Sequence, residues 1–308
     1  MAARSNFSRR LRRFGKAAGS RVAGAVAVGL MKAVRRMKPD RAFDWGGGIM
    51  RTIGPLLPEH RLGRANLKAA FPEKSDAEIK TILTGVWDNI GRMAAEFAHL
   101  DRIWHFDYAP DKGRIELSRE TMQRFFDLRE DGKPALIFAA HLANWELPAL
   151  AATVYGLDAA ILYRRPSVDE VDRMVREVRS VNMGTMIPAG IEAPMKLADL
   201  LAQGKHVAML VDQYAARGVE VTFFGRKTLG NPFLARLARH VDCPIHGVRV
   251  IRLPKGRFSV ELTEAIEPAR DADGAIDVIA TTQIITSVVE GWVREHPEQW
   301  LWVHRRWR

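Results

Sequence analysis

The sequence predicts an α/β protein in which a mixed sheet is flanked by helices, with a helical membrane-associating segment in front of it. Three observations support this: short apolar runs alternate with amphipathic segments after residue 130, the pattern over residues 39–130 is mainly helical, and residues 1–38 are cationic and amphipathic. A chain of 308 residues with 47% hydrophobic residues can bury a sizeable core. The single cysteine, Cys243, excludes an intrachain disulfide and a multi-cysteine metal site.

Residues 1–38 form the first predicted unit, a basic amphipathic membrane anchor. Its eleven Lys and Arg residues all precede the first acid, Asp40, whereas the rest of the chain carries equal numbers of basic and acidic groups. Apolar residues recur every three or four positions from Phe7 to Met37, which predicts a helix with an apolar stripe. The uncharged run over residues 22–31 is too short to span a bilayer, which takes about twenty residues. We therefore expect this helix to lie on an anionic membrane surface.

Other interpretations of this unit stay open. A basic stretch before a short apolar run also resembles a secretory signal peptide or a mitochondrial presequence. A nucleic-acid arm and a solvated helix have similar compositions. Because the remaining body is balanced in charge, the chain does not look like a uniformly basic nucleic-acid binder, and we expect no nucleic-acid partner.

Residues 39–308 form the second predicted unit, which is mainly helical over residues 39–130. Within that part, a helix over residues 64–71 is closed by Pro72, and Ser75 with Glu78 forms a capping box in front of the next helical stripe.

The part over residues 131–308 has the alternation typical of layered α/β folds. Strands are predicted over residues 134–140, 158–163, 206–211, 244–251 and 258–263, and helices over residues 168–180, 193–203, 232–241 and 276–294.

His141 directly follows the first of these strands, and Glu146 stands five residues later, at the predicted start of a further helix. Ligands of open α/β sheets bind at the carboxyl ends of strands. One helical turn would bring the Glu146 carboxylate back to the imidazole, where it would fix the tautomer and raise the basicity of the other ring nitrogen. Such a pair can deprotonate the hydroxyl of an acceptor that then attacks a thioester directly. From position alone, a capping or core role for His141 is the alternative.

Several other chemistries are excluded by missing motifs. The chain has no Gly-x-Ser-x-Gly, no His-Glu-x-x-His and no Gly-Lys followed by Ser or Thr, so a serine hydrolase elbow, a zincin helix and a P-loop are absent. Cys243, beside Pro244, is interpreted as a small core residue.

His141-x4-Glu146 is accompanied by other distinctive segments from about residue 60 to the end of the sequence. They are Arg64-Ala-Asn-Leu, Ala70-Phe-Pro-Glu73, Leu162-Tyr-Arg-Arg-Pro166, Met209-Leu-Val-Asp-Gln213, Phe223-Phe-Gly225 with Thr228, Phe233-Leu-Ala-Arg-Leu-Ala238, and the run from Glu295 to Arg306. In this order, the segments resemble the lipid A biosynthesis lauroyl/myristoyl acyltransferase family. Its superfamily of glycerolipid and lysophospholipid acyltransferases shares a His-x4-Asp/Glu motif, which His141 and Glu146 match. Two departures are the inserted Arg165 and Leu142, which stands where the family often has an aromatic residue.

The resemblance implies an acyltransferase-like fold that transfers a fatty acyl group from acyl carrier protein to the hydroxyl of a 3-hydroxyacyl chain on a lipid A precursor. It implies catalytic roles for His141 and Glu146, and work at the cytoplasmic face of the inner membrane. Arg164, rather than Arg165, is expected to meet the developing oxyanion or a substrate phosphate. The other substrate-binding positions are Asp212, Gln213, Gly225 and Thr228. No metal and no cofactor are expected, because the acyl thioester is itself a substrate.

Alternatives to these roles stay open. Arg164 could form a surface ion pair, Asp212 could cap a helix, and Gly225 and Thr228 could serve a turn. The four tryptophans after residue 290 suit either a membrane interface or packing of the tail under the site. Two other function classes also remain: an acyltransferase for another lipid, such as a lysophospholipid or glycolipid, and a non-catalytic cationic protein that binds membranes or RNA.

Overall fold

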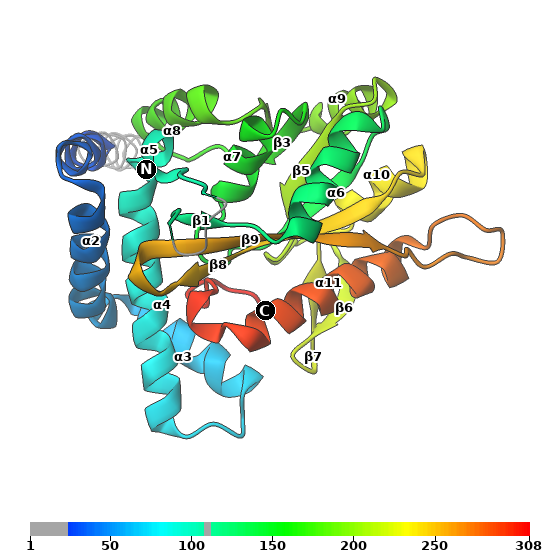
Figure 1. The fold of residues 1–308 in the computed structure, drawn as a ribbon. Coiled ribbons are helices and arrows are strands. Elements are labelled where there is room, and N and C mark those ends of the chain that lie inside the picture. Colours follow the sequence, from blue (N-terminus) through cyan, green and yellow to red (C-terminus); the bar gives the residue numbers. More distant parts are fainter. Residues whose placement is uncertain (1–23, 108–111) are drawn as a thin grey trace, which may run out of the picture.

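A seven-stranded mixed sheet forms the centre of the protein, in the order β1-β9-β8-β2-β5-β3-β4 (Figure 1). The computed structural model describes residues 24–107 and 112–308. The strands of this sheet are β1 (Ile115–Glu116), β2 (Leu136–Ala139), β3 (Ala159–Tyr163), β4 (Thr185–Pro188), β5 (His206–Leu210), β8 (Ile245–Leu253) and β9 (Arg257–Ile266). All neighbours are parallel except β8 and β9, which form an antiparallel hairpin. The predicted fold class, a mixed α/β sheet flanked by helices, is confirmed.

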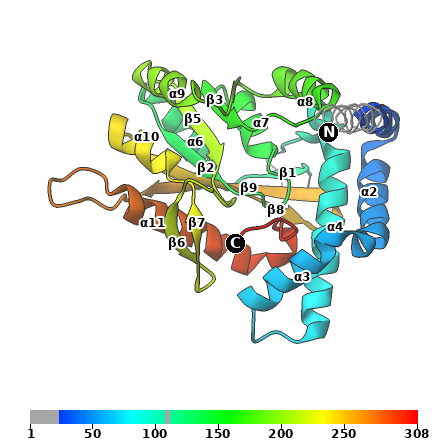
Figure 2. The same cartoon turned by 180° about the vertical axis from the view of Figure 1, so that it is seen from behind.

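Helices cover both faces of this sheet (Figures 1 and 2). They are α2 (Pro39–Ile53), α3 (Pro58–Ala70), α4 (Asp76–Phe97), α5 (Leu100–Ile103), α6 (Arg119–Glu130), α7 (Leu147–Val154), α8 (Asp169–Asn182), α9 (Ala193–Ala202), α10 (Phe233–Val241) and α11 (Val278–Glu295), with short 3-10 turns η1 (Gly54–Leu56), η2 (Pro254–Gly256) and η3 (Pro297–Gln299). Alternate side chains of β2 point to opposite faces. Leu136 and Phe138 join the core shared with α9, α10 and α11, whereas Ile137 and Ala139 join the core shared with α6 and α7.

The capping box predicted at the start of α4 is confirmed. The hydroxyl of Ser75 accepts a hydrogen bond from the backbone N–H of Glu78, whose carboxylate accepts one from the backbone N–H of Ser75 at 2.8 Å. The side chain and backbone thus satisfy donors that the first helical turn would otherwise leave unpaired.

Four of the described strands were not predicted from the sequence: β1, β4 and the antiparallel hairpin of β6 (Val219–Phe223) and β7 (Arg226–Gly230). β1 has only two residues, and β4 is an edge strand with no fully buried side chain. Polar and apolar residues alternate in β6, and three polar residues begin β7. None of the four therefore contains the continuous apolar run that marks a strand buried on both faces.

Only part of the predicted membrane anchor lies in the described region. Residues 24–36 are helical, as the apolar spacing predicted, and residues 1–23 lie outside the described residues. Among the helices that the structure describes, none is both long enough and apolar enough to span a bilayer.

The contact between α2 and α4 depends on two glycines, Gly46 and Gly91. A Cβ atom at Gly91 would lie 2.0 Å from the backbone oxygen of Gly46, so only a residue without a side chain allows this close approach.

We predict that Gly91→Ala lowers the free energy of unfolding by at least about 2 kcal/mol, because the two helices must separate to admit the methyl group. Gly48→Ala, on the same helix as Gly46, is the matched control: the nearest atom to its Cβ would be 3.7 Å away. It should be neutral or stabilising, because alanine favours helix more than glycine by about 1 kcal/mol. Urea unfolding of both variants measures the difference, and equal stabilities would contradict the close contact.

Candidate active site

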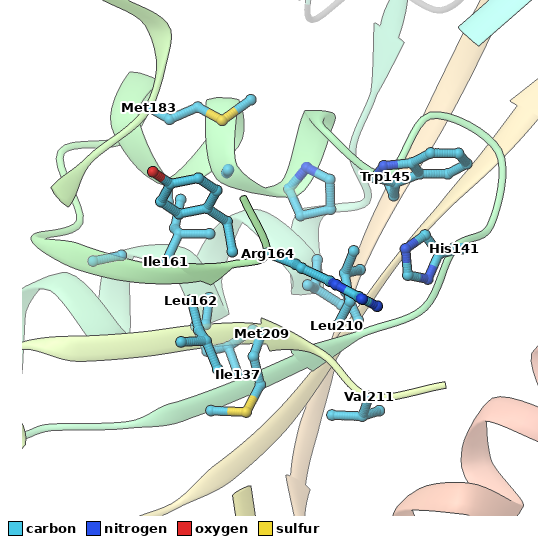
Figure 3. Close-up of a pocket in the computed structure, with 18 of the residues that line it drawn as sticks. Ile137, His141, Trp145, Ile161, Leu162, Arg164, Met183, Met209, Leu210 and Val211 are labelled. Carbon is cyan, nitrogen blue, oxygen red and sulfur yellow. The ribbon is translucent and has the colours of Figure 1, made fainter. Parts of the chain in front are cut away.

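An apolar cavity of about 670 Å³ lies against the sheet face that α6 and α7 cover, and reaches the carboxyl ends of β2, β3 and β5 (Figure 3). Its floor includes Ile137, Ile161 and Ala208 from adjacent strands, and His141 and Arg164 stand at the strand ends. The described residues that line it include no Ser, Thr, Cys, Asp or Glu. The cavity therefore suits an apolar chain whose polar end reaches His141.

His141 is held at the end of β2 by the carboxylate of Asp212, which follows β5. The imidazole Nδ1 lies 2.7 Å from Asp212 Oδ1, and the backbone N–H of His141 donates to Oδ2 at 2.9 Å. Because a carboxylate accepts, Nδ1 carries the proton and Nε2 is left as the basic nitrogen. The ring of Trp145 stands edge-on to the imidazole, with centroids 5.0 Å apart, and limits its rotation.

The Asp212 side chain is fully buried, and both of its carboxylate oxygens accept hydrogen bonds. Its side chain is 0% exposed, and the indole N–H of Trp300 donates to Oδ2 at 2.7 Å. Burial alone would raise the pKa of the Asp212 carboxyl, but the nearby His141 charge and the hydrogen bonds from His141 lower that pKa well below its usual range. Asp212 is consequently ionised at neutral pH and can stabilise an imidazolium.

The expected contact between Glu146 and the imidazole is wrong. Glu146 directly precedes α7, and its carboxylate is held in a bidentate pair by Arg179 of α8, at 2.5 Å from Nη2 and 3.0 Å from Nε. The Arg179 guanidinium also lies over the rings of Phe97 and Tyr163. The turn after β2 carries Glu146 away from His141 towards α8, and the carboxylate on Nδ1 is that of Asp212.

Two further predicted residues, Gln213 and Arg164, do line the cavity. The amide Nε2 of Gln213 lies 3.3 Å from Nε2 of His141, the ring nitrogen that Asp212 does not contact. The Arg164 side chain points in the direction of His141 (Figure 3) and forms no ion pair with any described residue, whereas Arg165 does not line the cavity. Arg164 is thus a free cation available to an anionic group.

Gly225 and Thr228 are not brought to this cavity. Gly225 has φ of +66° in the exposed turn between β6 and β7, which fits a turn role. Thr228 is buried, and its hydroxyl donates to the backbone oxygen of Arg306 at 2.6 Å. Both serve the hairpin and its contact with the tail.

A network of buried polar side chains holds the loop between β2 and α7 in place. Ala143 has φ of +47°, an uncommon conformation for a residue with a side chain. Its carbonyl accepts from Asn89 of α4, and Asn144 donates to Glu96 at 3.0 Å. Glu96 is 1% exposed and forms a bidentate ion pair with Arg252 of β8.

The chain from η3 to the tail also holds this loop in place. Its backbone reaches His141 and Ala143: Leu301 N–H donates to the carbonyl of His141 at 3.2 Å, and Ala143 N–H donates to the carbonyl of Gln299 at 2.9 Å. Asn66 of α3 donates to the carbonyl oxygens of Trp302 and His304. Of the two uses suggested for the C-terminal tryptophans, the structure shows packing under the site for Trp300 and Trp302, which are almost fully buried.

The family model for bacterial lipid A biosynthesis acyltransferases matches residues 19–308. The chain belongs to this family. The match covers the cavity, the His141 loop and the tail together. Membership of the lipid A acyltransferase family therefore indicates that the protein is an acyltransferase. Among curated proteins, none matches the chain significantly.

Sequence reasoning missed Arg179, Glu96 and Arg252. Nothing in the pattern marked them: Arg179 is one of several charges on an amphipathic helix, and the other two lie 156 residues apart in the chain. Asp212 was expected in the site, but not as the partner of the His141 imidazole. Its position just after β5, a strand parallel to β2, could have indicated this contact.

Cys243 and metal binding also bear on the chemistry. Cys243 packs in the core, and burial raises the pKa of its thiol to about 11, which suppresses the nucleophilic thiolate. Within the described residues, no group of three or more His, Cys, Asp or Glu side chains is arranged to hold a metal ion.

We predict that Asp212→Asn lowers kcat by about 10²–10⁴-fold, because an amide N–H facing Nδ1 would stabilise the tautomer whose Nε2 is protonated. Glu146→Gln should lower kcat less, but should reduce the free energy of unfolding by about 3 kcal/mol, because it leaves the Arg179 charge buried without its partner.

Steady-state kinetics and urea unfolding on both variants separate the two roles. A larger loss of kcat in Glu146→Gln than in Asp212→Asn would show that the dyad is assigned to the wrong carboxylate.

Proposed function

We propose that this protein transfers a fatty acyl group from acyl carrier protein to the hydroxyl of a 3-hydroxyacyl chain on a lipid A precursor. The observation that supports it most is the basic Nε2 of His141, backed by the buried Asp212 carboxylate, at the end of an apolar cavity. Family membership supports lipid A as the acceptor class.

In the proposed reaction, Nε2 of His141 removes the proton from the acceptor hydroxyl as its oxygen attacks the thioester carbonyl. Asp212 keeps Nδ1 protonated and stabilises the imidazolium that forms. The negative charge that develops on the carbonyl oxygen is met by Arg164. When the C–S bond breaks, the leaving thiolate takes the proton from the imidazolium, and the acyloxyacyl ester is released.

Direct transfer, without an acyl-enzyme, fits the lining of the cavity. The described lining residues offer no Ser, Thr or Cys as a nucleophile, and Cys243 lies in the core with a raised thiol pKa. Both substrates must then be bound at once. The thioester chain fills the cavity, and the acceptor approaches over Gln213 and Arg164.

The proposed location is the cytoplasmic face of the inner membrane, where the acceptor is a membrane lipid. Residues 1–38, with their eleven basic side chains, are the proposed anchor on anionic lipid. Residues 24–36 of this segment are helical, as surface anchoring requires.

The test is a transfer assay with the full-length protein, acyl carrier protein loaded with a labelled acyl group, and a detergent-dispersed lipid A precursor. We expect an acyloxyacyl product by mass spectrometry, and a loss of rate of about 10²–10⁴-fold in His141→Ala. Parallel reactions with acyl coenzyme A and with a lysophospholipid acceptor test the donor and the acceptor. Transfer to the lysophospholipid alone, or full activity of a folded His141→Ala protein, would contradict the proposal.

The cavity floor also predicts how acyl chain length is set. Ala208 of β5 lies between Ile137 and Ile161 in the sheet, and all three line the cavity. A larger side chain at position 208 would fill space along the path of the acyl chain, and a smaller one at 161 would enlarge it.

We predict that Ala208→Leu shifts the donor preference to shorter acyl chains and that Ile161→Ala shifts it to longer ones. Competition among acyl carrier proteins loaded with chains of different length gives the ratios of kcat/KM. Because the two substitutions change the volume in opposite directions, shifts in the same direction would indicate general damage to the fold and would contradict this acyl site.

A further inference from the structure

An unpartnered apolar stripe lies on α2 and the turn that follows it. Trp45 is 65% exposed, Ile49 49%, Ile53 42% and Leu56 82%. Steps of four, four and three residues place these side chains on one side of a helix. α2 itself lies on the outer side of α4, at the edge of the molecule in both views (Figures 1 and 2). Large apolar side chains gathered on one exposed face indicate an interaction surface.

Exposed cations precede this stripe in the chain and have no ion-pair partner among the described residues. Lys32, Arg36, Lys38 and Arg41 are all exposed, and none forms an ion pair within the part of the chain that the structure describes. By contrast, Arg35 in the same run pairs with Asp101.

The acids of α2 do not offset these cations. Asp40 pairs with Arg114 at 2.5 Å, and Asp44 pairs with Arg92 at 2.7 Å. Arg41 lies one helical turn before Trp45, so a free cation stands at the end of the apolar stripe itself.

We propose that this surface, the α2 face (Lys38, Arg41, Trp45, Ile49, Ile53 and Leu56), docks on an anionic lipid bilayer. Tryptophan and aliphatic side chains favour the boundary between headgroups and acyl chains, and the neighbouring cations bind anionic headgroups. A second copy of this chain is a poorer occupant, because a symmetric contact through the α2 face would bring the same unpaired cations together. Apart from Lys38, the α2 face lies outside the proposed anchor, because its other residues follow residue 38.

The test attaches an environment-sensitive fluorophore to a single cysteine on the α2 face. The full-length chain carries Cys243→Ala with Ile49→Cys, and the control carries Cys243→Ala with Ile279→Cys, an exposed isoleucine on α11. Vesicles of phosphatidylcholine with phosphatidylglycerol should shift the emission at position 49 to the blue and leave position 279 unchanged. Vesicle binding without any shift at position 49 would overturn the proposal.

Vesicle co-sedimentation of substituted proteins gives a second measurement. Trp45→Ser with Ile49→Ser should lower the partition coefficient about tenfold or more, because two large apolar side chains no longer enter the lipid. The matched control is Val154→Ser with Ile279→Ser, which removes two exposed apolar side chains elsewhere and should bind like the unaltered protein. Lys38→Gln and Arg41→Gln should each weaken binding about fivefold on anionic vesicles only.

Equal losses in the test pair and the control pair would contradict the proposal, as would a stable dimer that Trp45→Ser dissociates. Failure here is distinguishable from failure of the proposed function. Vesicle binding is measured without substrates, and Trp45→Ser with Ile49→Ser should retain acyl transfer to a detergent-dispersed acceptor.

Discussion

The buried ion pair between Glu96 and Arg252 is the interaction on which the geometry of the site depends. It joins α4 to β8 beneath the loop that carries His141, and its two members also hold Asn144 and Asn89. Two charges withdrawn from water contribute little net stability, yet removing one partner leaves an uncompensated charge that typically costs 3–5 kcal/mol. The pair therefore acts mainly by making one arrangement of the loop far more favourable than the others. The left-handed conformation of Ala143 persists because its surroundings hold it there.

A division of labour between the two carboxylates follows from this arrangement. Asp212 contacts the imidazole and accepts the indole N–H of Trp300, whereas Glu146 ties α7 to α8 through Arg179. The five-residue spacing between His141 and Glu146 thus corresponds to a turn and the start of α7. The carboxylate that hydrogen-bonds to the imidazole belongs to Asp212, which follows a different strand, β5. Arg179 also lines the cavity, so its pair with Glu146 helps to fix one wall of the cavity, while Asp212 acts on His141 at the strand ends.

Much of the fold could be predicted because its central strands are buried on both faces and its helices have regular apolar spacing. The apolar runs predicted as strands include β2, β3, β5 and β8, which are mostly buried, and β9, in which buried and partly exposed residues alternate. The Ser75 capping box indicated the start of α4. The same local reasoning located His141 at a strand end, whereas Arg164, Asp212 and Gln213 were expected from the family resemblance. It could not find the partner of each group, because the Asp212, Trp300 and Arg179 contacts join segments from 33 to 88 residues apart. The expected contact between Glu146 and the imidazole was wrong for that reason: spacing along the chain indicates proximity only within one element.

The contacts of residues 299–306 with the rest of the site have a consequence for biosynthesis. The carbonyl of His141, the carboxylate of Asp212 and the hydroxyl of Thr228 all find partners in this segment, which follows every strand of the sheet in the chain. A nascent polypeptide still lacking it has the Asp212–His141 pair available, but not the partners that this segment gives to the three groups. The full arrangement of the site can therefore assemble only after residues 299–306 have left the ribosome.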